Sequence, residues 1–198
     1  MKNFFININD HKISYYDNCS DGQSIIFIHG NSHNGKNFWK QFSEPLLSKF
    51  RLIAIDLPGH GNSSPDFTDE AYSLSCYANT LQSFVEELGL NNSLFVGHSL
   101  GGHILLEGIS KLNAKGLLIY GTPPIGIPLN PSVFLPHPDF KLFFKGELTD
   151  REAMSFASAC FTYDSPTIRE SIESIKKHIL KQELNLQRVW ENQNTRMK

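Results

Sequence analysis

The five residues Gly97-His98-Ser99-Leu100-Gly101 decide how this chain is expected to fold. They follow the apolar run 93–96 directly and precede residues 102–112, whose composition is typical of a helix. A serine between a strand and a helix, with glycines two residues before and two residues after it, is typical of a tight turn that points the hydroxyl out of the sheet. The five-residue pattern occurs by chance in many chains, so the flanking strand and helix carry the prediction.

Three further stretches lie at the ends of apolar runs. They are His29-Gly30-Asn31, residues 56–63 (Asp-Leu-Pro-Gly-His-Gly-Asn-Ser) and residues 120–124 (Tyr-Gly-Thr-Pro-Pro). The first is a loop of the kind that supplies a backbone N–H to an oxyanion hole. Together with residues 97–102, these stretches resemble the α/β-hydrolase superfamily, in the family's order and over residues 2–124. Beyond residue 124 the likeness is general.

Six short runs predict strands. They are residues 2–8, 12–17, 24–29, 51–56, 93–97 and 116–120. The first two predict an antiparallel hairpin, and the other four lack strict alternation, which is typical of strands buried on both faces of a parallel sheet. Apolar residues at helical spacing after Ser73, with Gly89 at their end, predict an intervening helix. We therefore expect an α/β fold with a doubly wound, mostly parallel sheet of the α/β-hydrolase type, and with the reactive loops at the carboxyl ends of its strands.

The resemblance implies roles for four residues. Ser99 is the implied nucleophile, and the backbone N–H groups of Asn31 and Leu100 are the implied oxyanion hole. His29 is a candidate for contact with the substrate, and the other interpretation is that it shapes its loop by hydrogen bonding. His98 is expected to pack beneath the turn that carries the nucleophile.

Residues 123–198 resemble the helical lid of that family. Proline is dense up to residue 138, which opposes regular structure. Thr149 opens a capping-box pattern for a helix through residue 161, and Pro166 opens another helical pattern. The sequence therefore predicts a core with six strands at residues 1–122 and a lid-like segment of the same domain at residues 123–198.

Aromatic side chains of the second segment are candidates for a substrate pocket. Phe134 and Phe143 are the two that we assign to it, and Phe156 is another candidate. Such side chains bound an apolar acyl or ring pocket in one interpretation and form ordinary core between helices in the other.

The triad of this family needs an acid and then a histidine after the serine in chain order. After Tyr120, no apolar strand leads into a Gly-x-x-Asp loop and no late histidine follows one. We therefore expect a chain that is truncated before the acid and the histidine and that lacks the last strands of the fold. Because a serine without a base is a poor nucleophile, such a chain is nearly inert alone. His137 and His178 are the remaining candidates for a replacement base.

The composition favours a soluble enzyme domain. The formal net charge of the 198 residues is −2 with both signs dispersed, which argues against nucleic acid and against an anionic membrane. No apolar run has the length of a membrane span. The three cysteines are widely spaced and form no metal or redox motif, which favours free thiols in a reducing cytoplasm. No metal-ligand spacing or dinucleotide fingerprint is present. We expect a cytoplasmic protein without metal or cofactor that acts on a small molecule.

Two functions are compatible with these residues. The first is a serine hydrolase that acts on an ester, thioester, amide or C–C bond of a small apolar substrate. The second is a non-catalytic member of the family that at most binds a ligand or a partner. Ser99 argues against the haloalkane dehalogenase and epoxide hydrolase branches, which resemble the chain at residues 29–31 and use an aspartate nucleophile.

The predicted strand from Gly116 to Tyr120 has an open edge that is expected to pack against another segment. In the fold that the chain resembles, this strand is the sixth and two more follow it. The run is apolar and free of charge and proline, which is the kind of edge that recruits another chain. We expect the edge to be covered by the chain's own C-terminal helices or by a second molecule, the latter being self-association through residues 116–120.

Overall fold

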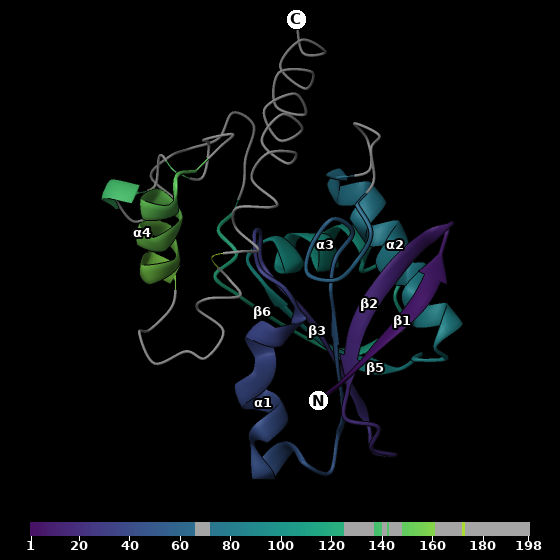
Figure 1. Ribbon diagram of the computed structural model, residues 1–198. Helices are drawn as coiled ribbons and strands as arrows, with labels where there is room; N and C mark the ends of the chain where they lie inside the picture. The colour runs from purple at the N-terminus through teal and green to yellow at the C-terminus, as the bar shows by residue number, and fades with distance from the viewer. Residues whose placement is uncertain (66–71, 125–136, 140–141, 143–147, 161–171, 173–198) are drawn as a thin grey trace, which may run out of the picture. The chain divides into compact units, whose positions relative to one another are not determined.

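The chain divides into two compact units, residues 1–122 and residues 123–198. The computed structural model describes residues 1–65, 72–124, 137–139, 142, 148–160 and 172 (Figure 1). The strands are β1 (Lys2–Ile8), β2 (His11–Asp17), β3 (Ser24–Ile28), β4 (Arg51–Ile55), β5 (Ser93–His98) and β6 (Ala114–Tyr120). The helices are α1 (Trp39–Ser43), α2 (Leu74–Glu87), α3 (Leu100–Gly108) and α4 (Asp150–Cys160), with short 3-10 helices η1 (Gly35–Phe38) and η2 (Pro45–Leu47). The lid-like role of the second unit stays a prediction.

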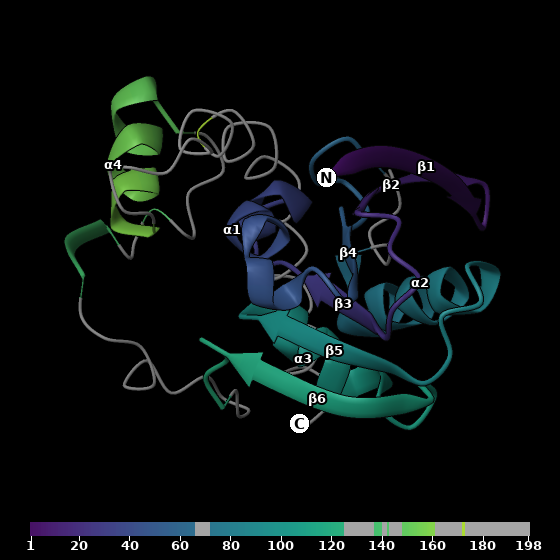
Figure 2. The same cartoon turned by 90° about the horizontal axis from the view of Figure 1, so that it is seen from below.

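The six strands form one sheet in the order β1-β2-β4-β3-β5-β6. β1 and β2 make an antiparallel hairpin, and β2 also runs antiparallel to β4. The remaining strands are parallel, and Figure 2 shows β3, β5 and β6 side by side. The predicted mostly parallel sheet of the α/β-hydrolase type is confirmed. The carboxyl ends of four strands therefore meet at one edge, where open α/β sheets bind their ligands.

Alternate residues of β3 face two different apolar clusters. Ile26 and Ile28 belong to the cluster that contains the buried faces of α2 and α3. Ile25 and Phe27 belong to another cluster, which contains Phe38 of η1. Because helical segments pack on both faces, the sheet is doubly wound, and this explains why β3 lacks the strict alternation of a half-exposed strand.

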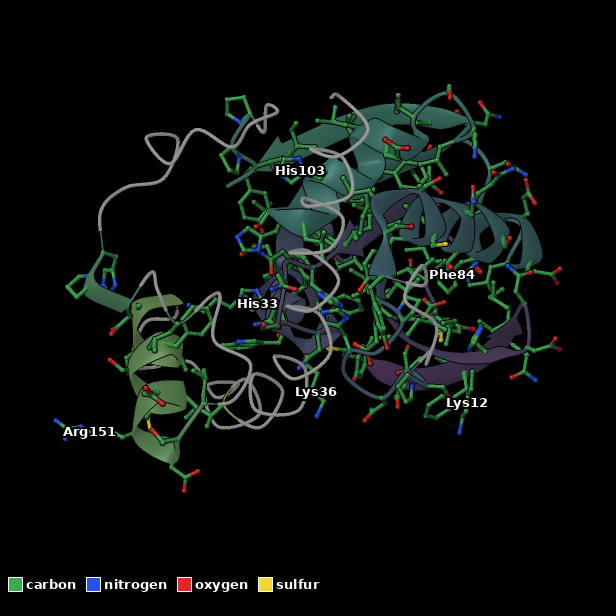
Figure 3. The ribbon with its side chains drawn as sticks, turned by 90° about the horizontal axis from the view of Figure 1, so that it is seen from above. Lys12, His33, Lys36, Phe84, His103 and Arg151 are labelled. Carbon is green, nitrogen blue, oxygen red and sulfur yellow. The ribbon has the colours of Figure 1, made fainter. Side chains whose placement is uncertain are left out.

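Helix α2 begins where the sequence predicts. Ser73 is the extended N-cap, and its hydroxyl accepts a hydrogen bond from the Cys76 N–H at 3.2 Å. The buried face of the helix includes Phe84, labelled in Figure 3, which is fully buried in the core. Burial of such a side chain contributes about 1.5–3 kcal/mol. Gly89, with a φ of 62°, ends the helix in the left-handed conformation that glycine tolerates.

Helix α3 is shorter at its end than the predicted stretch. It ends at Gly108, and residues 109–112 form a turn in which the Lys111 N–H donates to the Gly108 carbonyl at 2.9 Å. A methyl group at Gly108 would lie 3.2 Å from the Ala78 side chain of α2, so this glycine brings the two helices close together.

Strand β6 differs from the prediction that it is buried on both faces. Leu117, Leu118 and Tyr120 are 40%, 59% and 46% exposed. Within the described residues, only β5 pairs with β6. The prediction was wrong because an apolar run has the same sequence character at the centre of a sheet and at its edge. The cover that we expect over this edge stays a prediction.

The second unit contains the predicted capping box. The Glu152 N–H donates to the Thr149 hydroxyl at 3.3 Å, and the Glu152 carboxylate accepts from the Thr149 N–H at 2.9 Å. Phe156 of α4 is 3% exposed and packs with Leu142, Ala153, Ala157 and Ile172. This side chain is therefore core between segments of its own unit, the simpler of the two interpretations. Of the helix predicted to begin near Pro166, only Ile172 lies within the described residues, and it is helical.

Among the described helices, none combines the length and the hydropathy that a membrane-spanning helix needs.

Candidate active site

Ser99 lies on the turn between His98, the last residue of β5, and Leu100, the first residue of α3. Its φ of 50° and ψ of −114° are a conformation that residues with a side chain rarely adopt. Its N–H donates to the Tyr120 carbonyl at 3.0 Å, and its carbonyl accepts from the Thr122 hydroxyl at 3.1 Å. The end of β6 therefore holds the strained turn in place.

The glycines around Ser99 allow the backbone to come close on two sides. A methyl group at Gly97 would lie 2.7 Å from the Gly101 carbonyl oxygen. A methyl group at Gly101 would lie within 2.9 Å of backbone atoms of both Ile28 and His29. Since backbone atoms cannot swing aside as a long side chain can, α3 reaches the end of β3 only because residue 101 is glycine.

The loop after β3 passes directly beside the serine. A methyl group at Gly30 would lie 3.2 Å from the Ser99 Cβ and 2.8 Å from the His98 Nδ1. Asn31 is the next residue of this loop, and Leu100 is the next residue after the serine. The fold therefore brings together, around one turn, the three residues to which the sequence assigns the nucleophile and the oxyanion hole.

His29 is fixed beneath the same loop. Its side chain is fully buried, and its Nε2 accepts a hydrogen bond from the Leu57 N–H at 3.0 Å. The proton therefore sits on Nδ1, which donates to the Gly30 carbonyl at 2.7 Å. Both ring nitrogens serve the backbone, which favours the loop-shaping interpretation of His29 over contact with a substrate.

Asp56, the residue directly after β4, connects two loops. Its buried carboxylate accepts from the Gly35 N–H at 2.7 Å and from the Asn62 N–H at 3.0 Å. Burial raises the pKa of Asp56, and these two hydrogen bonds oppose that rise. One side chain thus connects the loop after β3 with the loop after β4.

Three rings stack beside the serine, one from the loop after β3 and two from the last residues of β5 and β6. The centroids of the His33 and His98 rings are 5.4 Å apart, and those of His98 and Tyr120 are 4.9 Å apart. Such pairs contribute about 0.5–1.5 kcal/mol each beyond their buried area. Burial, together with the neighbouring His98 and His29, lowers the pKa of His33 to about 3, and burial also lowers the pKa of His98. Both rings are therefore neutral near pH 7, and His98 packs between His33 and Tyr120.

Sequence reasoning missed two of these residues. It did not single out His33, nor the Thr122 hydroxyl that supports the serine carbonyl. Their partners lie far away along the chain, and neither residue belongs to a periodic pattern, so the fold alone reveals their role.

Other predicted residues lie elsewhere or outside the described residues. Phe134, Phe143 and His178 fall outside them. The His137 ring accepts a hydrogen bond from the Asp139 N–H at 3.1 Å, within the second unit. In the described part of the chain, no histidine or carboxylate is hydrogen-bonded to the Ser99 hydroxyl, and no group of three or more His, Cys, Asp or Glu residues could hold a metal ion.

The family of the chain follows from comparison with known proteins. The model of the alpha/beta hydrolase family matches residues 25–190. The chain belongs to this family, as the four sequence stretches and the sheet topology predict.

Two individual proteins show how similar the chain is to its relatives and how much of their length it covers. The dihydrolipoyllysine-residue acetyltransferase component of the acetoin cleaving system of Cupriavidus necator is 28% identical over 122 residues, which are 62% of this chain and 32% of that protein. The non-heme chloroperoxidase CPO-A1 of Kitasatospora aureofaciens is 29% identical over 144 residues, 69% of this chain and 51% of that protein. The chain thus spans between 32% and 51% of these two relatives.

A solved structure matches more of the chain. The N-acyl homoserine lactonase AidH, complexed with N-butanoyl homoserine, superposes with a TM-score of 0.86 at 27% identity, over 98% of this chain and 71% of that one.

Proposed function

We propose that this chain is, or is part of, a serine hydrolase that acts on an ester or related acyl bond of a small apolar substrate. Ser99 is the nucleophile, and the backbone N–H groups of Asn31 and Leu100 form the oxyanion hole. The observation that carries the proposal is the strained Ser99 turn at the β5–α3 junction, with the Gly30 loop beside it. Strain of this kind is retained where function needs it.

The reaction passes through an acyl-serine intermediate. The Ser99 Oγ attacks the carbonyl carbon, the carbonyl electrons move onto oxygen, and the two N–H groups stabilise that oxyanion. Collapse expels the alcohol oxygen, which takes up the proton that the serine gave up. Water then attacks the acyl-serine, releasing the acid and restoring the hydroxyl. Asp56 and His29 support this chemistry only indirectly, by fixing the loops.

The substrate class follows from chemistry and similarity together. A backbone oxyanion hole suits any acyl bond, and a lactone is a cyclic ester. The likeness to an N-acyl homoserine lactonase makes lactones with a short acyl chain the first compounds to test. We expect no cofactor, a small-molecule partner and a cytoplasmic location.

One observation favours the non-catalytic alternative. Within the described residues, the Ser99 hydroxyl has no histidine partner, and loss of the base histidine costs about 10⁶ in the turnover of a model serine protease. Binding and an oxyanion hole still retain roughly 10³ to 10⁴ over water. We therefore expect turnover by this chain alone to be close to that of Ser99→Ala, while covalent modification of Ser99 remains measurable.

The test is covalent labelling of the full chain with an alkyl fluorophosphonate, followed by intact-mass and peptide-mass analysis. We expect modification of Ser99, none of the exposed Ser48, and none in Ser99→Ala. Hydrolysis of p-nitrophenyl butyrate and of N-butanoyl homoserine lactone is measured in parallel. Labelling that is equal in Ser99→Ala contradicts the proposed nucleophile. Ser99-dependent turnover of about 1 to 10³ per second contradicts the expected inertness and redirects the search to His137 and His178.

A further inference from the structure

The three-ring stack joins the ends of three parallel strands. His33 comes from the loop after β3, His98 ends β5, and Tyr120 ends β6. The planes of His33 and His98 differ by 15°, and those of His98 and Tyr120 by 29°, so the rings lie nearly face to face. His98 is the middle ring, and it directly precedes Ser99.

Glycine backbone encloses the His98 ring on two further sides. A methyl group at Gly30 would lie 2.8 Å from the His98 Nδ1, and one at Gly121 would lie 3.1 Å from the His98 Cδ2. A side chain at either position would collide with the ring, so both neighbours of His98 have to be glycine.

The backbone beside the ring also contacts the serine. The Ser99 N–H bonds to the Tyr120 carbonyl at 3.0 Å, and Gly30 lies against the Ser99 Cβ.

We propose, on the basis of the function above, that His98 is a positioning residue for the Ser99 reaction. Its flat ring, held between His33 and Tyr120, couples the loop after β3 to the end of β6 and fixes the Ser99 hydroxyl against the Asn31 loop. The ring acts through its shape and its stacking faces, and it transfers no proton.

The first test compares two substitutions of the full chain by fluorophosphonate labelling over a range of reagent concentrations. His98→Phe keeps a flat ring, and His98→Leu fills a similar space without one. A misplacement of a reacting group by about 1 Å costs up to about 100-fold. We expect the maximum labelling rate to fall about tenfold in His98→Leu and to stay within about threefold in His98→Phe, with the half-saturating concentration unchanged in both.

His103 provides the matched control. It is a partly buried histidine of α3 that belongs to no ring of the stack, and Figure 3 labels it together with His33. We expect His103→Leu to label like the wild type. Equal losses in His98→Leu and His98→Phe, or no loss in His98→Leu, overturn the proposal. A lower labelled fraction at an unchanged rate in His98→Leu indicates partial unfolding, and it also counts against positioning.

The second test reads the coupling without any chemistry at Ser99. His33→Leu changes one end of the stack, and hydrogen exchange of the peptides that cover residues 118–122 reads the other end. We expect faster exchange of these peptides in His33→Leu and an unchanged exchange rate in His103→Leu. Unchanged exchange overturns the coupling. If the wild type and Ser99→Ala label equally, the proposed function fails by itself, and the exchange result alone decides whether the stack links the loops.

Discussion

The centre and one edge of the sheet differ in how tightly the backbone encloses them. At the centre, Gly101 of α3 lies against the backbone of β3 and leaves no space for a methyl group. At the edge, Leu117 and Leu118 of β6 are 40% and 59% exposed. The sequence is apolar and glycine-containing in both places. The enclosed region fixes the turn of the candidate nucleophile, while the open region has solvent or a partner as its neighbour.

This difference separates two kinds of substitution. At the centre, an added atom meets main chain that hydrogen bonds hold in place, so the cost falls on folding itself. At the edge, the side chains of Leu117 and Leu118 are exposed, so the cost of changing either one falls on association. The predictions below test this division, in order of decreasing effect.

The largest effect is expected for Gly101→Ala. Overpacking of this kind costs about 1–3 kcal/mol, and we expect a loss of about 3 kcal/mol in the free energy of unfolding because the atoms encountered are backbone. The control is Gly89→Ala, where φ is +62° and an added methyl group would have no neighbouring atom within 4 Å. The left-handed conformation alone costs about 1 kcal/mol there. Urea unfolding of both variants measures the difference, and equal losses would show that the centre can relax.

Asp56→Ala is expected to cost about 2 kcal/mol, since it leaves the Gly35 and Asn62 N–H groups without their acceptor. Asp21→Ala, at an exposed position, serves as the control and should change stability by less than about 0.5 kcal/mol. The measurement is again urea unfolding. A loss no larger than that of the control would mean that other groups or water satisfy both N–H donors.

Acid should weaken the centre through His33. The pKa of His33 is lowered from 6.5 to about 3 in the folded chain, mainly by burial. Between these values the unfolded chain holds a proton that the folded chain does not. Stability therefore falls as the pH drops below about 6.5, by about 1.4 kcal/mol per pH unit for this group.

The comparison with His33→Phe isolates this contribution. Asp56, whose pKa is raised by burial, adds a slope of the opposite sign in both proteins, which cancels in the difference. Thermal unfolding between pH 5 and pH 7 should show a shallower decline for His33→Phe. Parallel declines would assign the acid sensitivity to other groups.

The smallest effect on stability is expected at the edge. Leu118→Lys should change the free energy of unfolding by less than about 0.5 kcal/mol, because the side chain is already exposed. It should nevertheless abolish self-association through residues 116–120, because charge protects sheet edges. Light scattering over a range of concentrations measures this, with Leu46→Lys, 80% exposed, as the control. An unchanged mass in Leu118→Lys would mean that β6 recruits no second copy.

The sequence predicted the elements whose signals are local. Ser73 and Thr149 mark helix starts because the cap is a contact within one turn, and both hydrogen-bonding patterns are present. Strands β3 and β4 were predictable because burial on both faces removes alternation. The predicted burial of β6 was wrong because burial depends on a neighbouring strand, which the run itself does not encode.

The candidate site divides in the same way. Ser99, Asn31 and Leu100 were accessible through short motifs, in which the spacing of glycines carries the geometry. His33 and Thr122 were not, since their contacts with residues 98 and 99 exist only after three strands have paired. The roles of Ser99, Asn31, Leu100, Phe134 and Phe143 remain predictions.

Exchange of the ring proton of buried His29 with water measures the opening of the loop after β3. Its Nδ1 proton, bonded to the Gly30 carbonyl at 2.7 Å on a fully buried side chain, can exchange with water only when the loop opens. A proton held in this way gives its own downfield resonance in a nuclear magnetic resonance spectrum of the unlabelled protein. The lifetime of that signal in water reports how often the loop beside Ser99 opens.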